Sequence, residues 1–186
     1  LQSMAPELKG TAVGRIFEDR VSILFPAAPV LVQPLHEAVG ILHSPATLYV
    51  MGDSPRLDFM RDTVAGMLGT FELKAEEGPD DTPGFAGSSA IKGYDGFHEE
   101  LASGREHRID EREFLAARLI DFLINDPDRS RDNYDFARFG EKGAYTWRPL
   151  PTDRDQPFVD AGGWLNSLGF RPMLPTLMSF GPTFDL

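Results

Sequence analysis

The spacing of apolar and polar positions predicts short helices that alternate with strands in the first part of the chain. Apolar residues recur at helical spacing over residues 11–24, 35–42 and 57–68. Two apolar runs, residues 46–51 and 70–75, are typical of strands that follow the second and third helices. The N-terminal part is therefore expected to combine helices with at least two strands.

A strong helix is predicted to begin after Asp110. Glu113 stands three positions later, which is the capping-box spacing at a helix N-terminus. The residues from 114 to 123 are apolar around much of the helical circumference, so we expect this helix to be central. A shorter helix is predicted over residues 95–101.

A β-hairpin is predicted directly after this helix and one intervening loop. Residues 134–139 and 144–150 carry aromatic and apolar side chains, and the turn between them contains two glycines. A hairpin brings its outer ends together, and each outer end here carries an acidic cluster. We therefore expect one convergent group of polar side chains: Asp126, Asp128, Asn133, Asp153 and Asp155. Such oxygen ligands suit Mg²⁺ or Mn²⁺.

Composition changes this picture mainly by excluding partners. The 186 residues carry a net charge of -11, which argues against a nucleic-acid-binding or anionic-membrane surface. There is no cysteine, hence no disulfide and no thiolate site, and no stretch resembles a transmembrane helix. An acidic, Gly- and Pro-rich run suggests a linker over residues 77–93, between parts at 1–76 and 94–186.

Three interpretations compete for the first acidic cluster. Its aspartates could cap nearby backbone groups in a solvated loop. A calcium loop is disfavoured because Arg131 stands at the sixth position, where Gly is needed, and Ala137 at the twelfth, where Glu is needed. A phosphoryl-transfer loop needs an Asp followed five positions later by an Asn, and Asp128 and Asn133 have this spacing.

Both clusters resemble parts of known kinase-like families. Asp128-Arg129 with Asn133-Tyr134 resembles the catalytic loop of atypical protein-kinase-like enzymes, and Asp153-Arg154-Asp155 before Phe158 resembles the metal-binding strand of CotH-type spore-coat kinases. A closer resemblance covers most of the chain: bacterial envelope-associated proteins with Gly-Asp-Trp-Asp-Arg-His and Pro-Arg-Asp-Arg-Asp-Gln-Ala-Phe at these places. The chain departs from them at Pro127 and Ser130.

The resemblance implies an α+β, protein-kinase-like fold with a partial N-terminal lobe and a helical C-terminal lobe that carries the catalytic-loop hairpin. It implies an ATP- and metal-dependent phosphotransferase acting on an unknown phosphate acceptor, located in a bacterial envelope. The first N-lobe strands, the Gly-rich loop and the ATP-binding Lys would then lie upstream of Leu1. Residues 70–75 would be the hinge beside the nucleotide, with Glu72 and Lys74 as its binding residues.

The same resemblance assigns roles within the clusters. Asp128 would be the catalytic base, with Arg129 beside it, and the metal ligands would be Asn133, Asp155, Asp153 and Asp126. Arg129 is also expected to brace the loop by pairing with Asp126, Asp153 or Asp160. Two other functions remain open: a metal-dependent phosphoester hydrolase that uses the same carboxylates, and a non-catalytic pseudokinase or binding module. His36 and His43 are interpreted as solvated or capping residues.

Overall fold

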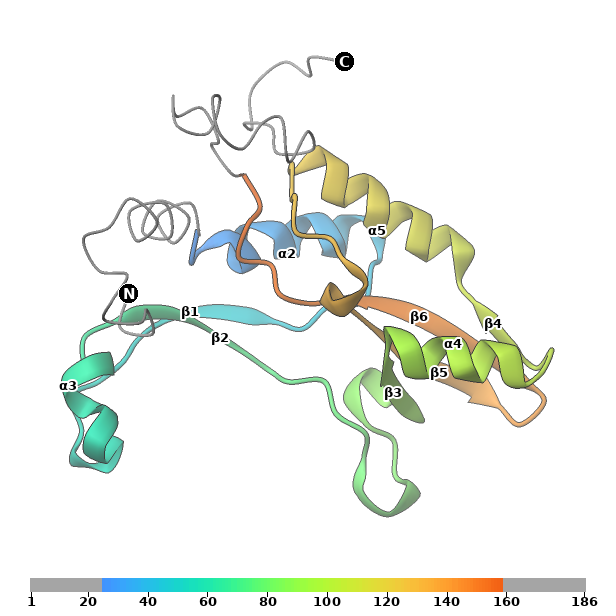
Figure 1. Cartoon of the computed structure of the whole chain (residues 1–186), viewed down its shortest axis with the longest axis horizontal. Helices are drawn as coiled ribbons and strands as arrows, with labels where there is room; N and C mark the ends of the chain where they lie inside the picture. The colour runs from blue at the N-terminus through green and yellow to red at the C-terminus, as the bar shows by residue number, and fades with distance from the viewer. Residues whose placement is uncertain (1–24, 159–186) are drawn as a thin grey trace, which may run out of the picture.

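The computed structural model describes residues 25–158, which form a mixed α+β structure with four α-helices and two sheets (Figure 1). The α+β class expected from the sequence is therefore confirmed for this part. The helix expected at residues 11–24 and the side chain of Asp160 lie outside the described residues. None of the helices from 25 to 158 combines the length and the apolar character that a membrane crossing requires.

The larger sheet is built around the expected hairpin. Strands β5 (Tyr134–Glu141) and β6 (Ala144–Pro151) pair antiparallel, with Glu141 opposite Ala144, so the turn is the two residues Lys142 and Gly143. Both strands are thus slightly longer than expected. β3 (Ala90–Gly93) pairs antiparallel with β5, and β4 (His107–Ile109) pairs parallel with β6. The order across the sheet is β3-β5-β6-β4.

Two helices pack against this sheet and form the core with it. The ring of Phe97, from α4 (Tyr94–Ser103), stacks on Phe136 of β5 at 3.8 Å between centroids. Phe114, from α5 (Glu111–Leu123), also contacts Phe136 and meets Tyr134 edge-on. Both helices therefore cover the face of the sheet from which Phe136 projects, and the buried aromatic residues fix their positions.

The start of α5 follows the expected capping pattern only in part. The carboxylate of Asp110 accepts a hydrogen bond from the backbone N–H of Glu113 at 2.9 Å. The Glu113 carboxylate does not return to Asp110; it binds the Arg148 guanidinium, at 2.5 and 2.9 Å, and the backbone N–H of Leu42 at 2.7 Å. Glu113 thereby connects α5 to β6 and to the segment around Leu42.

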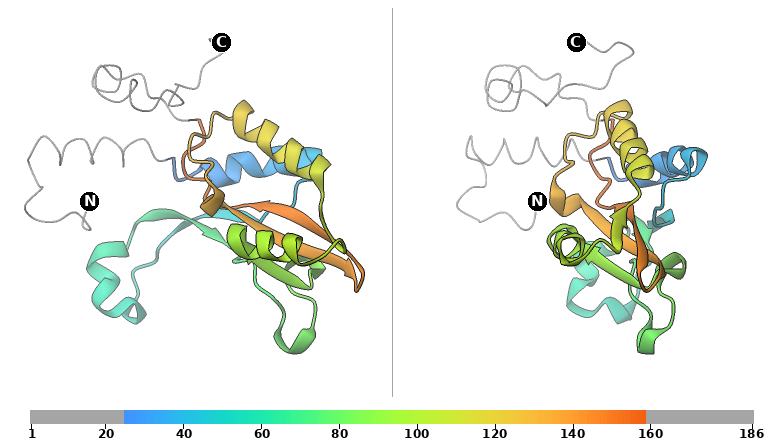
Figure 2. Two further views of the ribbon diagram at one scale, coloured as in Figure 1. Left: turned by 45° about the vertical axis from the view of Figure 1, so that its right-hand side comes forward. Right: turned by 90° about the vertical axis from the view of Figure 1, so that its right-hand side faces the viewer.

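The N-terminal described part contains one long helix and a two-stranded ribbon. α2 (Ala28–Val39) lies beside α5, as Figure 1 and Figure 2 show, and ends at Gly40 in the left-handed conformation. β1 (Ala46–Val50) and β2 (Leu68–Glu72) form an antiparallel ribbon that extends away from the larger sheet. The helix that was expected over 35–42 thus begins earlier, at Ala28. Pro29 occupies its first turn, and Pro34 lies inside the helix.

The expected helix over residues 57–68 is wrong. The segment forms a 3₁₀ helix (Pro55–Met60) and a single turn of α3 (Arg61–Val64). Asp58 and Gly66 have positive φ, which interrupts a helix. Phe59, at 86% exposed, and Met60 have no core to pack against, so the helical spacing of apolar residues gains no stabilisation.

Two further boundaries differ from expectation. The expected strand over 70–75 is shifted towards the N-terminus, as β2 ends at Glu72. The proposed linker 77–93 contains short 3₁₀ turns (Pro79–Asp81 and Phe85–Gly87), but its last residues form β3 of the larger sheet.

Candidate metal centre

The first acidic loop begins where α5 ends. Asn125 adopts a positive φ of 48°, which turns the chain out of the helix. Asp126 is buried, and its Oδ1 accepts from the backbone N–H of Asp128 at 3.3 Å. The Asn133 side-chain amide donates to the Asp128 carbonyl at 2.6 Å and closes the loop, which continues through a 3₁₀ turn (Arg131–Asn133) into β5. The backbone around Asp128 is therefore held from both sides.

The second acidic loop follows β6 directly. Alternation along an extended strand would place Asp153 and Asp155 on one face and Arg154 on the other. Strand β6 ends at Pro151, however, and Asp153 has a left-handed φ of 52°. The separation arises instead from this turn: Asp153 is exposed, while Arg154 is only 5% exposed.

Arg129 joins the two loops. Its guanidinium donates to the backbone carbonyls of Asn133, at 3.3 Å, Thr152, at 2.8 Å, and Asp153, at 2.5 Å. Its Nε lies 3.0 Å from a carboxylate oxygen of Asp126. The expected bracing role is confirmed, with Asp126 as the carboxylate partner. The planar fork, however, contacts backbone carbonyls rather than a second carboxylate.

Arg154 forms a second buried ion-pair network behind the loops. One guanidinium nitrogen contacts carboxylate oxygens of Asp121, at 2.5 Å, and Asp126, at 2.9 Å. Another lies 3.2 Å from Nε2 of His36. Asp121 also accepts from Tyr134 Oη at 2.6 Å. Asp121 and Asp126 therefore have their charge matched by arginine inside the protein.

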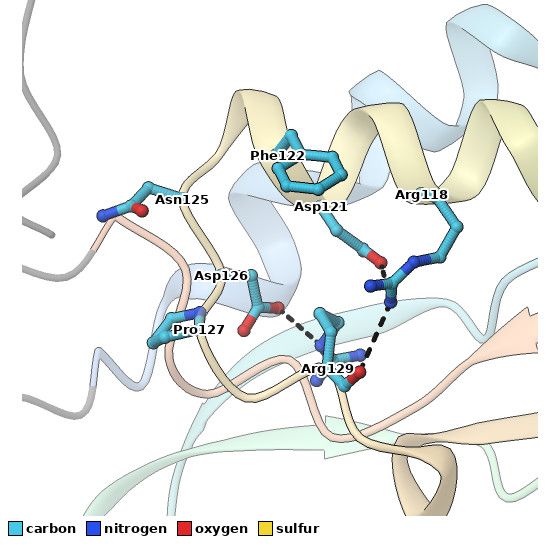
Figure 3. Close-up of a pocket in the computed structure, with 7 residues that line it drawn as sticks. All are labelled: Arg118, Asp121, Phe122, Asn125, Asp126, Pro127 and Arg129. Atoms are coloured by element: carbon cyan, nitrogen blue, oxygen red, sulfur yellow. Dashed lines mark hydrogen bonds and ion pairs between the residues drawn. The ribbon is translucent and has the colours of Figure 1, made fainter. Parts of the chain in front are cut away.

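Arg118 and Arg129 lie at the edge of this network that faces α5. Figure 3 shows Arg118 between the carboxylate of Asp121 and the carbonyl of Arg129, and Asp126 directed at Arg129. These residues line a cavity of about 260 Å³ together with Phe122, Asn125 and Pro127.

Three carboxylates remain outside the arginine network and gather at one place. Asp128, Asp153 and Asp155 each offer an oxygen atom within 4.8 Å of the others. Gln156 donates to Asp128 Oδ2 at 2.7 Å, and Oδ1 of Asp155 is buried without a hydrogen-bond partner. Among residues 25–158, no lysine or arginine forms an ion pair with these three carboxylates.

The electrostatics of Asp155 reflect this crowding. Burial raises its pKa above the usual range of an aspartate, and the charges of Asp153 and Asp128 raise it further. Neighbouring negative charge disfavours the ionised form of a carboxyl group, and a bound cation would stabilise that ionised form.

The other residues that the sequence predicted for the site do not belong to this trio. Asp126 faces the arginine network, and Asn133 is buried with its amide nitrogen bound to Asp128. Desolvation raises the pKa of Glu72 at the end of β2, and the charge of Asp153 adds to the rise, so this carboxylate lies near the trio. Lys74 is 83% exposed and pairs with Glu76 at 3.2 Å.

Sequence reasoning missed four residues that shape the centre. His36 is 2% exposed against Arg154, so its interpretation as a solvated or capping residue is wrong. Asp121 was not singled out, although a carboxylate between the apolar residues Ile120 and Phe122 is a signal for a buried ion pair. Arg154 and Gln156 were visible as parts of the second cluster, but their partners depend on the turn at Asp153.

Comparison with known proteins adds no assignment to this geometry. A scan against protein-family models finds no match, and a search of curated proteins finds no significant match either.

Proposed function

We propose that this chain is a kinase-like, divalent-metal-dependent phosphotransferase domain whose metal centre is the trio Asp128, Asp153 and Asp155. The observation that carries the proposal is the division of carboxylates. Asp121 and Asp126 are paired with buried arginines, whereas the trio gathers without a cationic partner among the described residues.

The donor set fits a hard cation. Carboxylate oxygens from two loops, with the Asn133 side chain close to the same backbone, are the ligands that Mg²⁺ and Mn²⁺ take. Because the Asn133 amide nitrogen already donates to Asp128, only its Oδ1 is suited to a metal. The buried, unpartnered Oδ1 of Asp155 is the atom that gains most from a cation.

The chain's own residues would divide the work as follows. Asp155 and Asp153 hold the metal, which when bound neutralises phosphate charge. Asp128, oriented by Gln156 and by the closure of its loop, accepts the proton of the attacking hydroxyl. Arg129 and Arg154 keep the two loops in register, so the carboxylates are in place before substrate arrives.

Nucleotide binding is the second part of the proposal. ATP would lie along the end of β2, where Glu72 is close enough to Asp153 to interact electrostatically. Lys74 would leave Glu76 to contact phosphate, since their pair is exposed and worth little. The resemblance to envelope-associated proteins supports the bacterial envelope as the location.

Thermal unfolding tests the metal centre directly. Saturating Mg²⁺ or Mn²⁺ should stabilise the chain by about 1–3 kcal/mol relative to EDTA, because the cation binds only the folded state. Asp155→Asn should remove most of this gain, because it deletes a carboxylate ligand. It should also raise the metal-free melting temperature, because the ionised form of this carboxyl group is disfavoured in the folded protein.

Asp62→Asn is the matched control, because Asp62 is an exposed aspartate of α3 outside the trio. It should leave both melting temperatures unchanged. If wild-type curves coincide in EDTA and in millimolar Mg²⁺ and Mn²⁺, the centre is not a metal site and the clusters are structural. Phosphate transfer from labelled ATP then separates an active enzyme from a metal- and nucleotide-binding pseudokinase.

A further inference from the structure

The outer face of α5 carries a row of exposed apolar side chains. Leu115, Leu119 and Phe122 are spaced by four and three positions and so lie on one side of the helix. They are 60%, 59% and 70% exposed, and Leu123 beside them is 50% exposed. We call these four residues the α5 stripe.

The stripe lies opposite the face that α5 buries. Ala117 and Ile120 point into the core, together with the ion-paired Asp121. The helix is therefore apolar on two opposite sides. This pattern is typical of helices that pack against other elements on both sides. Within the described part of the chain, only the inner side is covered. Phe122 also lines the cavity of Figure 3, beside the acidic loop.

The chain beyond Phe158 starts at the correct end of this helix. The backbone N–H of Phe158 donates to the carbonyl of Ile124 at 2.8 Å, which fixes the start of the following segment at the C-terminal end of α5. Leu115 lies nine residues before Ile124, or about 14 Å along a helix axis. A few extended residues span that distance, and 28 residues remain from 159 to 186.

The composition of this segment suits an apolar surface. Of its 28 residues, 13 are hydrophobic and only three are charged (Asp160, Arg171 and Asp185). By contrast, the 24 residues before Phe25 include six charged ones. Both segments meet the described part close together, since the backbone N–H of Phe25 donates to the carbonyl of Asp155. Their hydrophobic fractions are similar, 11 of 24 and 13 of 28, so the lower charge content of residues 159–186 is what favours that segment.

We propose that residues 159–186 dock on the α5 stripe and complete a second apolar layer outside α5.

The absence of cysteine in the sequence permits a clean test in the full chain. Leu119→Cys is labelled with a benzophenone maleimide, irradiated, digested and mapped by mass spectrometry. Glu99→Cys, at an exposed position of α4, is the control, and Leu115→Cys repeats the test at the other end of the stripe. These exposed-face substitutions remove no core side chain.

Docking predicts intramolecular adducts between the label of the Leu119→Cys variant and peptides from 159–186, which the Glu99→Cys variant does not form. It also predicts that a small maleimide labels both stripe variants at least about ten-fold more slowly than the control variant, because a packed segment must open first. Equal labelling rates for Leu119→Cys and Glu99→Cys would overturn the proposal. So would adducts that map to residues 1–24 or to a second copy of the chain.

Discussion

Because His36 is buried, we expect the free energy of unfolding to decrease in mildly acidic solution. The ring lies on α2, is 2% exposed, and its Nε2 faces the Arg154 guanidinium at 3.2 Å. A guanidinium can only donate, so Nε2 must be unprotonated and accept. Burial, followed by the charge of Arg154, lowers the His36 pKa from 6.5 to about 3.

The sign and size of the effect follow from linkage. The unfolded chain takes up a proton near pH 6.5, whereas the folded chain does so only near pH 3. The stability that neutral His36 contributes is therefore complete above pH 6.5 and is lost as pH falls towards 3. Between pH 7 and pH 5 the loss is about 2 kcal/mol, which is a large fraction of the stability of a typical domain.

Urea unfolding at pH 7, 6 and 5 measures this loss in wild type and in His36→Gln. Glutamine keeps an acceptor for Arg154 but cannot be protonated, so the variant should lose about 2 kcal/mol less than wild type over this range. His98→Gln removes an exposed histidine of α4 and should keep the wild-type slope. The difference between variants isolates His36 from the carboxylates that also titrate. Parallel curves for wild type and His36→Gln would refute the reasoning.

Two further substitutions test the arginine network by chemical denaturation. Arg154→Leu removes the cation that Asp121 and Asp126 share, leaves each carboxylate with one arginine (Arg118 or Arg129), and should cost about 3 kcal/mol. Arg131→Leu, at a 62% exposed arginine, should change the midpoint little, and a similar cost for both variants would contradict the network. Arg129→Lys keeps the charge but loses the fork that joins three backbone carbonyls, and should cost about 1–3 kcal/mol. An unchanged midpoint would show that the fork is dispensable.

The sequence was most informative where local chemistry decides the structure. The hairpin was predictable because its turn needs a positive φ, which Gly143 adopts at 96°. Gly140, in β5 just before the turn, also has a positive φ, of 92°, and a Cβ there would come 2.4 Å from the Ala144 carbonyl oxygen. The start of α5 was predictable from the Asp110 cap. The convergence of the two acidic loops followed from hairpin geometry, and Asp128, Asp153 and Asp155 are brought together as expected.

The sequence was least informative where burial decides. Residues 57–68 have helical spacing, but no core reaches Phe59, so the helix does not form. Asp126 and Asp128 look equivalent in the sequence, yet one faces two buried arginines and the other faces Gln156. Asn125, whose positive φ turns the chain after α5, is a residue type that favours this conformation, but the partners of the two carboxylates depend on tertiary packing.

The distribution of arginines among the carboxylates favours the proposed metal centre over a purely structural role for the two acidic loops. Arginines placed only to neutralise the acidic loops would gain most by contacting the most crowded carboxylates. Instead, Arg129 and Arg154 contact Asp121, Asp126 and backbone carbonyls on the inner side. The raised pKa of Asp155, caused by burial and then by Asp153 and Asp128, reflects the cost of leaving the trio without such a partner. This division, with two buried arginines behind the loops and uncompensated repulsion in front of them, is what the proposed metal centre requires.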